Sequence, residues 1–348
     1  MKAARLYSFN DIRVEEMPVP EPGPGEALMK TMASGICSGD VMPWYIEKKA
    51  PLVLGHEPAG IIVKTGPGVK NFREGDRVAV HHHAPCLDAS CPFCLRGEHV
   101  HCPAWKASSI IPGGIAEYIL IPALNLKNDT RRLPDGISFE DGALMEPLGC
   151  VLKGLGKVGP VSGRTAFVIG LGVMGALHIL ALKAMGAGRI IGADMVPWRL
   201  NKARELGADE VIEVFPGEEK RDLVQELLKL TGGRGADIVI SGPNSASAME
   251  TAVRSAAEGG KVILFTPAKP GEKLVIDPNL VYFREIALIP SYSTGPVETQ
   301  RALDMIAAGH VRAEMAVTHK FGIGETPMAY RLSAEARDSL KCVIIFGT

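Results

Sequence analysis

Four of the seven cysteines lie close together in the sequence, with the spacing Cys86-LDAS-Cys91-PF-Cys94-LRGEHVH-Cys102. In a long chain such a group is more typical of a metal site than of disulfides, because the thiol pools of the cytosol keep cysteines reduced. Four thiolates close a tetrahedron around zinc and leave no open position for a substrate. The spacing therefore predicts a structural zinc ion, and the alternatives are exposed loop thiols or two disulfides.

A second set of metal-ligand residue types is spread along the sequence. Cys37 follows Gly35-Ile36, His56 stands before Glu57, and Glu146 precedes Pro147. One thiolate, one imidazole and one carboxylate would leave a fourth coordination position open, as a catalytic zinc ion requires. Spacing alone does not show that Cys37, His56 and Glu146 meet, so they are a candidate set at this point.

The segment after residue 168 has the pattern of a dinucleotide-binding turn, Gly170-Leu171-Gly172-Val173-Met174-Gly175, between an apolar strand and an apolar helical run. Gly170 permits the tight turn, Gly172 lets the backbone approach a pyrophosphate, and Gly175 lets the helix pack on the strand. The start of the helix, at Val173 and Met174, favours the phosphates. We therefore predict a dinucleotide site here.

The next predicted strand ends in Asp194, about twenty residues further on. A carboxylate at this place accepts hydrogen bonds from both ribose hydroxyls of NAD, and its charge repels the 2′-phosphate of NADP. Arg199 lies nearby and could flank the adenine or attract a phosphate. The pattern favours NAD over NADP, and the alternative is a structural glycine turn with a solvated aspartate.

Two kinds of domain are needed to position these residues. Residues 1–147 are dense in Gly and Pro and contain short alternating segments, which is typical of a β-rich domain. Residues 148–294 alternate strands and helical segments six times, which predicts an α/β domain with a doubly wound parallel sheet of the Rossmann type. Residues 295–348 are expected to return to the first domain, with a helix that starts at Val297 and a strand at 343–346.

In the order of its motifs the chain resembles the zinc-dependent medium-chain alcohol dehydrogenases, in the branch that contains sorbitol and threonine dehydrogenases. The matching features are the Gly-His-Glu turn, the four-cysteine loop, the Glu-Pro-Leu segment and the glycine turn. Together they cover nearly the whole chain. The resemblance implies that the β-rich catalytic domain is GroES-like and contains both zinc sites, while the Rossmann domain binds NAD.

The resemblance also implies roles for single residues. Cys37 and His56 correspond to catalytic zinc ligands, and Glu146 matches the glutamate that ligates or faces this zinc. Glu57 is the adjacent carboxylate that binds the metal in some states. Asp40 matches an acid that orients His56, as metal-bound imidazoles require.

Ser291 and Tyr292 resemble the family's loop on the nicotinamide side. The chain departs from the family in the proton relay, because the usual Ser or Thr two residues after the ligand cysteine is Gly39, and a relay histidine of some members is Met42. The four-residue spacer after Cys86 is also two residues longer than usual. These departures leave the proton route open.

The triplet His81-His82-His83 directly precedes the cysteine loop. Neighbouring side chains of a β-strand point to opposite faces, so these three imidazoles are not expected to share one metal. We expect them in wall or surface positions.

The composition restricts the class of protein. The 348 residues include 46% hydrophobic and 22% charged side chains and carry a net charge of −1, which argues against a disordered chain and a charge-driven nucleic-acid binder. No apolar run reaches the length of a membrane span, and the first residues lack a signal-peptide core. We expect a cytoplasmic homo-oligomer, a dimer or a tetramer, without membrane or nucleic-acid partners.

The predicted function is the reversible, NAD-linked oxidation of a secondary alcohol to a ketone, with two zinc ions per chain, one catalytic and one structural. The substrate is expected to be a polyol, a simple secondary alcohol or an L-threonine-like molecule. The alternatives are a zinc-free reductase of the same fold and a non-catalytic protein that binds zinc and dinucleotide.

Overall fold

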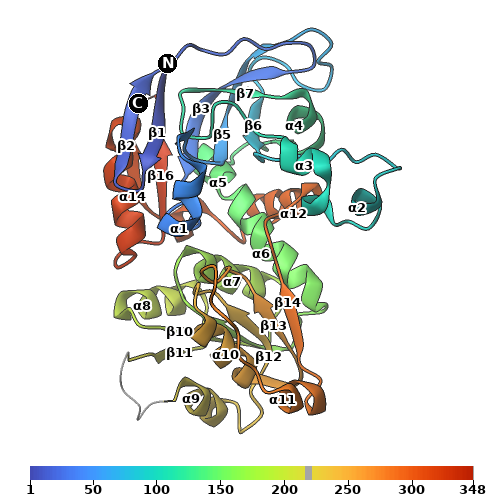
Figure 1. The fold of residues 1–348 in the computed structure, drawn as a ribbon, viewed down its shortest axis with the longest axis vertical. Coiled ribbons are helices and arrows are strands. Elements are labelled where there is room, and N and C mark those ends of the chain that lie inside the picture. Colours follow the sequence, from blue (N-terminus) through green and yellow to red (C-terminus); the bar gives the residue numbers. More distant parts are fainter. Residues whose placement is uncertain (216–221, 348) are drawn as a thin grey trace. The chain divides into compact units, whose positions relative to one another are not determined.

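The structure, a computed structural model, describes residues 1–215 and 222–347. The chain forms two compact units (Figure 1): unit 1 contains residues 1–149 together with the segment from residue 293 on, and unit 2 contains Cys150–Tyr292. The two places where the chain leaves and re-enters unit 1 adjoin, because Thr294 Oγ1 lies 2.8 Å from the position that a Cβ atom on Gly149 would take. Unit 2 is therefore inserted at one point of unit 1.

Unit 2 is built on a six-stranded parallel sheet with the strand order β11-β10-β9-β12-β13-β14. Its strands are β9 (Thr165–Ile169), β10 (Arg189–Asp194), β11 (Glu210–Glu213), β12 (Ala236–Ser241), β13 (Ala256–Leu264) and β14 (Ala287–Pro290). The order reverses between β9 and β12, and doubly wound sheets bind ligands at the carboxyl ends of the strands beside such a reversal. The predicted Rossmann-type sheet is confirmed.

Helices cover both faces of this sheet. They are α6 (Met145–Val158), which begins in unit 1, α7 (Val173–Ala184), α8 (Pro197–Leu206), α9 (Leu223–Leu230), α10 (Ala246–Ser255) and α11 (Pro278–Phe283). Phe167 of β9 shares a core with residues of α9, α10 and α11 on one face. Its neighbour Val168 points to the other face, where its Cγ1 lies 3.5 Å from the position of a Cβ atom on Gly175 of α7. Gly154 of α6 approaches Ile263 in the same way.

The segment 147–149 lies inside α6. Pro147 is tolerated there because it falls in the first turn of the helix, where its missing N–H would have no partner inside the helix.

Unit 1 contains a seven-stranded sheet with the order β15-β16-β3-β5-β6-β8, and β7 also pairs with β3. Its strands are β3 (Ala27–Gly35), β5 (Glu57–Thr65), β6 (Arg77–Val80), β7 (Tyr118–Ile121), β8 (Thr130–Arg132), β15 (Val317–Gly322) and β16 (Lys341–Ile345). A smaller sheet has the order β2-β1-β4, with β1 (Lys2–Ser8), β2 (Asp11–Glu16) and β4 (Leu52–Val53). This is the β-rich domain that the sequence predicted.

Short helices connect these strands. They are α1 (Pro43–Ile46), α2 (Pro92–Leu95), α3 (Pro103–Ala107), α4 (Ala123–Asn128), α5 (Phe139–Ala143), α12 (Pro296–Ala307), α13 (Ala313–Ala316), α14 (Thr326–Glu335) and the 3₁₀ turns η1 (Glu47–Lys49), η2 (His99–His101) and η3 (Ile323–Glu325). In the described residues no helix is sufficiently long and apolar to cross a bilayer.

Three strands from distant parts of the sequence place the candidate site. Figure 1 shows β3 and β5, in blue, and β16, in red, in the same unit. Gly35 of β3 pairs with Val343 of β16 on one side and with Glu57 of β5 on the other. The end of β3 is thereby fixed between the two strands that carry the buried charges described next.

Candidate active site

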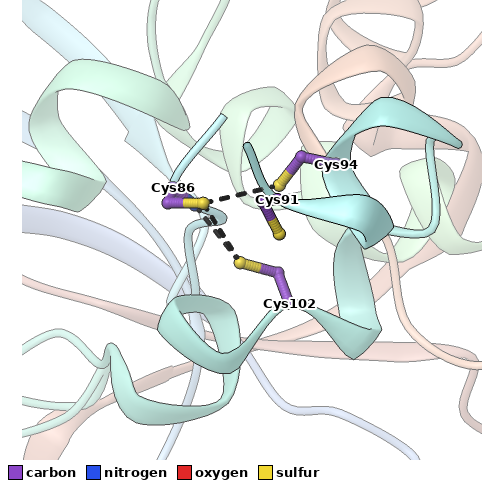
Figure 2. A group of neighbouring side chains, drawn as sticks. All are labelled: Cys86, Cys91, Cys94 and Cys102. Carbon is purple, nitrogen blue, oxygen red and sulfur yellow. Dashed lines mark hydrogen bonds between the residues drawn. The ribbon is translucent and has the colours of Figure 1, made fainter. Parts of the chain in front are cut away.

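The four cysteines of the predicted structural zinc site converge in unit 1 (Figure 2). Their sulfur atoms all lie within 4.8 Å of one another, and Cys86 Sγ lies 3.7 Å from Cys94 Sγ and 3.6 Å from Cys102 Sγ. Cys91 stands directly before α2 and Cys102 directly before α3. The longer first spacer does not separate Cys86 from the other three cysteines.

Backbone N–H groups surround these sulfur atoms. The N–H of Cys86 donates to Cys102 Sγ, and the N–H of Asp88 donates to Cys86 Sγ, both over 3.5 Å. Burial raises the pKa of the Cys102 thiol, but the N–H groups of Cys86, Trp105 and Ala104 outweigh burial and bring this pKa to about 6. None of the seven cysteines forms a disulfide. Burial raises the pKa of the Cys94 thiol to about 12, so the metal-free site favours thiolate at Cys102 but not at Cys94. Zinc binds cysteine only as thiolate, so its binding would displace the remaining protons.

A second group of ligand atoms lies at the end of the seven-stranded sheet. Cys37 follows β3, His56 directly precedes β5, and Glu57 begins β5; their ligand atoms lie within 4.8 Å of one another. The turn before His56 requires glycine, because Gly55 has a φ of 84° and a Cβ atom there would approach Ile115 Cγ1 to 2.6 Å. The strand ends therefore bring together two of the three predicted catalytic ligands and Glu57.

Asp40 orients the imidazole of this group. Its carboxylate is 4% exposed, and Oδ2 lies 3.3 Å from Nδ1 of His56, which leaves Nε2 for a metal. Burial lowers the pKa of His56, but Asp40 and Cys37 raise it well above the ordinary value. A metal that enters this site must displace the extra proton.

Glu57 is held by Lys341, a residue that the sequence-based predictions did not include. Lys341 Nζ forms a salt bridge with Glu57 Oε2 and donates a hydrogen bond of 2.8 Å to the carbonyl of Ile36, and Lys341 and Glu57 are only 1% and 2% exposed. The two side chains meet over Gly35, where a Cβ atom would overlap Glu57 Oε2. Burial raises the pKa of Glu57, and Lys341 opposes that shift. The one hint in the sequence is a lysine that opens an otherwise apolar strand.

Glu146, the third predicted catalytic ligand, is grouped with His81 and His82 in the structure. The ligand atoms of these three residues lie within 4.8 Å of one another. The ring centroids of His82 and His56 are 4.6 Å apart, so the two groups adjoin. His83 is not part of this group, so the three imidazoles do not share one set of ligand atoms. His81 and His82 do come together, because β6 ends at Val80 and the alternation of a strand no longer applies.

Tyr330 of α14 is a second residue that the sequence gave no reason to select. It is 3% exposed, and its hydroxyl has no hydrogen-bond partner among the described residues. Burial and the charges of Asp40, Cys37 and Glu57 raise its pKa well above the ordinary value. The phenol therefore stays neutral at the border of the metal-ligand group.

In unit 2, the predicted glycine turn connects β9 with α7. Gly170 has a φ of 85°, a backbone conformation that other residues rarely adopt. Gly172 directly precedes Val173, where α7 begins, so the first N–H groups of that helix, including that of Met174, have no partner within the helix. A Cβ atom on Gly175 would overlap the carbonyl oxygen of Gly170. The turn thus has the shape that a pyrophosphate requires.

Asp194, at the end of β10, is tied to this turn. Its Oδ2 accepts a hydrogen bond of 2.7 Å from the N–H of Leu171, and its Oδ1 accepts one of 2.9 Å from the N–H of Val196. Arg199 Nη1 lies 3.8 Å from Asp194 Oδ2, and burial lowers the pKa of this guanidinium. The guanidinium also lies over Gly172, 3.6 Å from the position of a Cβ atom there. Asp194 and Arg199 therefore face the same turn.

Ser291 and Tyr292 follow β14, at the carboxyl edge of the sheet. Ser291 is buried, and its hydroxyl has no hydrogen-bond partner among the described residues. The carbonyl of Tyr292 accepts a hydrogen bond of 2.8 Å from Lys153, while its ring is 58% exposed. Ser291 thus offers a buried hydroxyl at the edge where such sheets bind their ligands.

Comparison with known proteins identifies the family. The model of the alcohol dehydrogenase GroES-like domain matches residues 23–129, and that of the zinc-binding dehydrogenases matches residues 173–308. Sorbitol dehydrogenase of Bombyx mori is 33% identical to the chain, over 98% of this chain and 97% of its own. The chain belongs to the zinc-dependent medium-chain alcohol dehydrogenases.

Two further similarities agree with this assignment. L-Threonine 3-dehydrogenase of Pyrococcus horikoshii is 31% identical to this dehydrogenase, over 88% of the chain and 87% of its own. A crystal structure of a Sinorhizobium meliloti protein bound to NADP superposes with a TM-score of 0.86 at 28% identity, over 99% of this chain and 98% of that one. The GroES-like domain and the Rossmann domain of the predicted fold are confirmed.

One departure from the family can be seen in the geometry of this dehydrogenase. At Gly39, where a relay hydroxyl is usual, a Cβ atom would lie 3.4 Å from Cys37 Sγ, 3.9 Å from Tyr45 Cε1 and 4.0 Å from Met42 Cε. These are ordinary contact distances, so the position has room for a Cβ atom that the sequence does not supply.

Proposed function

We propose that this dehydrogenase catalyses the reversible NAD-linked oxidation of a secondary alcohol to a ketone. The observation that carries the proposal is the convergence of Cys37, His56 and Glu57 at the end of one sheet, with Asp40 aimed at the imidazole. The names of the relatives, which include sorbitol and L-threonine dehydrogenases, support a polyol, a simple secondary alcohol or an L-threonine-like molecule as the substrate.

The donor sets fit two zinc ions with different roles. Four thiolates suit a closed structural site, whereas one thiolate, one imidazole and one carboxylate, from Glu57 or Glu146, suit a site with an open position. When bound, zinc lowers the pKa of the substrate hydroxyl and NAD accepts the hydride. The chain's own contribution is to fix the His56 tautomer through Asp40 and to hold Glu57 through Lys341.

We also propose that the proton of the hydroxyl leaves through water. The position of the usual relay hydroxyl is Gly39, which offers no side chain. Water next to Glu57, whose pKa burial raises, is the route that these residues support.

The preference for NAD is supported by Asp194. Its carboxylate accepts two backbone N–H groups and still has lone pairs for ribose hydroxyls. A 2′-phosphate here would meet this negative charge, although Arg199 offers a compensating positive one. The similarity to a protein bound to NADP makes the test necessary. We expect Asp194→Gly to narrow the ratio of kcat/KM for NAD over NADP, and a wild-type preference for NADP would contradict the assignment.

A cytoplasmic location and a homo-oligomer, a dimer or a tetramer, belong to the same proposal. The free thiols of the cysteine loop support a reducing compartment. Size-exclusion chromatography with light scattering tests the oligomeric state.

The experiment that tests the activity is a screen of zinc-loaded protein with NAD against matched sugar alcohols, simple secondary alcohols and L-threonine, followed by NADH absorbance. We expect turnover with at least one class, and its loss in His56→Ala with the fold retained. His310→Ala, a change of an exposed histidine, serves as the control. Absence of turnover with every class would refute the proposed reaction.

A further inference from the structure

Two neighbouring imidazoles in unit 1 have buried nitrogen atoms for which the described residues provide no hydrogen-bond partner. They are Nε2 of His81, whose side chain is fully buried, and Nδ1 of His82. A buried polar atom without a partner costs about 1–3 kcal/mol. The two nitrogen atoms are therefore expected to serve a ligand.

A buried carboxylate orients His81. Asp129 is fully buried, and its Oδ2 lies 2.8 Å from His81 Nδ1, so that this nitrogen carries the proton and Nε2 presents its lone pair. Thr299 Oγ1 donates to Asp129 Oδ1 over 2.5 Å, and Arg131 Nη2 lies 3.4 Å from that same oxygen. Histidines that bind a metal through one ring nitrogen usually donate the N–H of the other ring nitrogen to a carboxylate or a similar acceptor.

The geometry of the group suits a metal ion. The rings of His81 and His82 are nearly perpendicular, at 87°, with their centroids 4.9 Å apart, and Glu146 supplies a carboxylate within 4.8 Å of both ligand nitrogens. Two imidazoles and one carboxylate form a set that binds zinc and other borderline divalent ions, whereas magnesium and calcium prefer oxygen ligands.

We propose that His81, His82 and Glu146 form a second divalent-cation site next to that of Cys37 and His56, so that unit 1 binds three metal ions. The ring centroids of His82 and His56 are 4.6 Å apart, so the two sites would adjoin. In this arrangement Glu146 ligates the additional ion and Glu57 completes the first site. The proposal does not depend on the proposed reaction, since its test measures metal binding alone.

The test is a titration of metal-free full-length protein with cobalt(II), followed by bound metal and by absorption spectrum. Both cysteine-containing sites give cobalt(II) a strong near-ultraviolet thiolate charge-transfer band, whereas a site of two imidazoles and a carboxylate gives only weak visible bands. We expect three equivalents per chain, of which one adds no thiolate band. His82→Asn should lose that equivalent and keep the other two, while His310→Asn, the exposed control, should keep all three.

Asp129→Asn provides a second variant, because it keeps the size of the side chain and removes the charge behind His81. Loss of such an orienting carboxylate weakens metal binding by about 10–100-fold, and we expect this loss for the thiolate-free equivalent alone. Circular dichroism verifies the fold of each variant. If His82→Asn does not fold, the metal titration of Asp129→Asn decides whether the third site exists. Three results would each overturn the proposal. The wild type could saturate at two equivalents of cobalt, the variants could still bind the third equivalent, or His82→Asn could lose an equivalent that has a thiolate band.

Discussion

The buried pair of Glu57 and Lys341 leads to a quantitative prediction. Lys341→Met keeps the length of the side chain but leaves the Glu57 carboxylate without its ammonium partner in a place where both side chains are at most 2% exposed. Removing one partner of a buried pair costs about 3–5 kcal/mol, because an uncompensated charge remains. The lost hydrogen bond to Ile36 adds about 1 kcal/mol. We expect the free energy of unfolding of metal-free protein to fall by about 4–6 kcal/mol.

Urea unfolding followed by fluorescence and circular dichroism measures this change. The matched control is Lys320→Met, which breaks the salt bridge of Lys320 with Glu140; Lys320 is 56% exposed, and such pairs contribute about 0–1 kcal/mol. The double variant Glu57→Gln/Lys341→Met removes both charges and should be more stable than Lys341→Met. If the double variant is no more stable than the single one, or if Lys341→Met costs no more than Lys320→Met, the account of a buried charge pair is refuted.

Three further predictions concern single side chains. Cys91→Ser should release one zinc ion per chain and lower the melting temperature, since a structural site contributes to folding, and metal analysis with a thermal melt measures both. Gly39→Ser adds a hydroxyl beside Cys37, where a Cβ atom has room, and should change kcat by less than about 10-fold if water carries the proton. A rise in kcat of about 10²–10⁴-fold, the usual rate gain from acid–base catalysis, would contradict the water route. Burial lowers the pKa of His178 to about 4 from 6.5, so the unfolded state binds a proton first as the pH falls and stability is lost from about pH 6.5 downward. Between pH 7.5 and 5.5 this loss is about 1 kcal/mol, and urea unfolding of His178→Leu should lack it.

Features that depend on local sequence could be predicted. The strand that ends at Asp194 was expected where β10 ends, because an apolar run before a turn is specified by its own residues. The cysteine loop could be recognised for the same reason, since short spacers bring its four sulfur atoms together whatever the rest of the chain does. The glycine turn before α7 likewise combines a steric requirement with a position between strand and helix.

Features that depend on packing between distant segments could not be predicted. Lys341 reaches Glu57 only because β3 separates their strands and Gly35 leaves room above it. Tyr330 borders the same group from a helix whose sequence contains no metal-ligand pattern. The pairing of His81 with Asp129 depends on where β6 ends, which alternation of residue types does not determine.

The contact of Gly149 with Thr294 has a consequence for the modular design of the chain. Because the chain leaves and re-enters unit 1 at adjoining positions, joining residue 149 to residue 293 through a short linker should yield a self-contained metalloprotein. Residues 150–292, expressed separately, should likewise be an autonomous nucleotide binder. A recombinant protein that exchanges only this insert would retain every metal-ligand residue named above and acquire the cofactor preference of the donor.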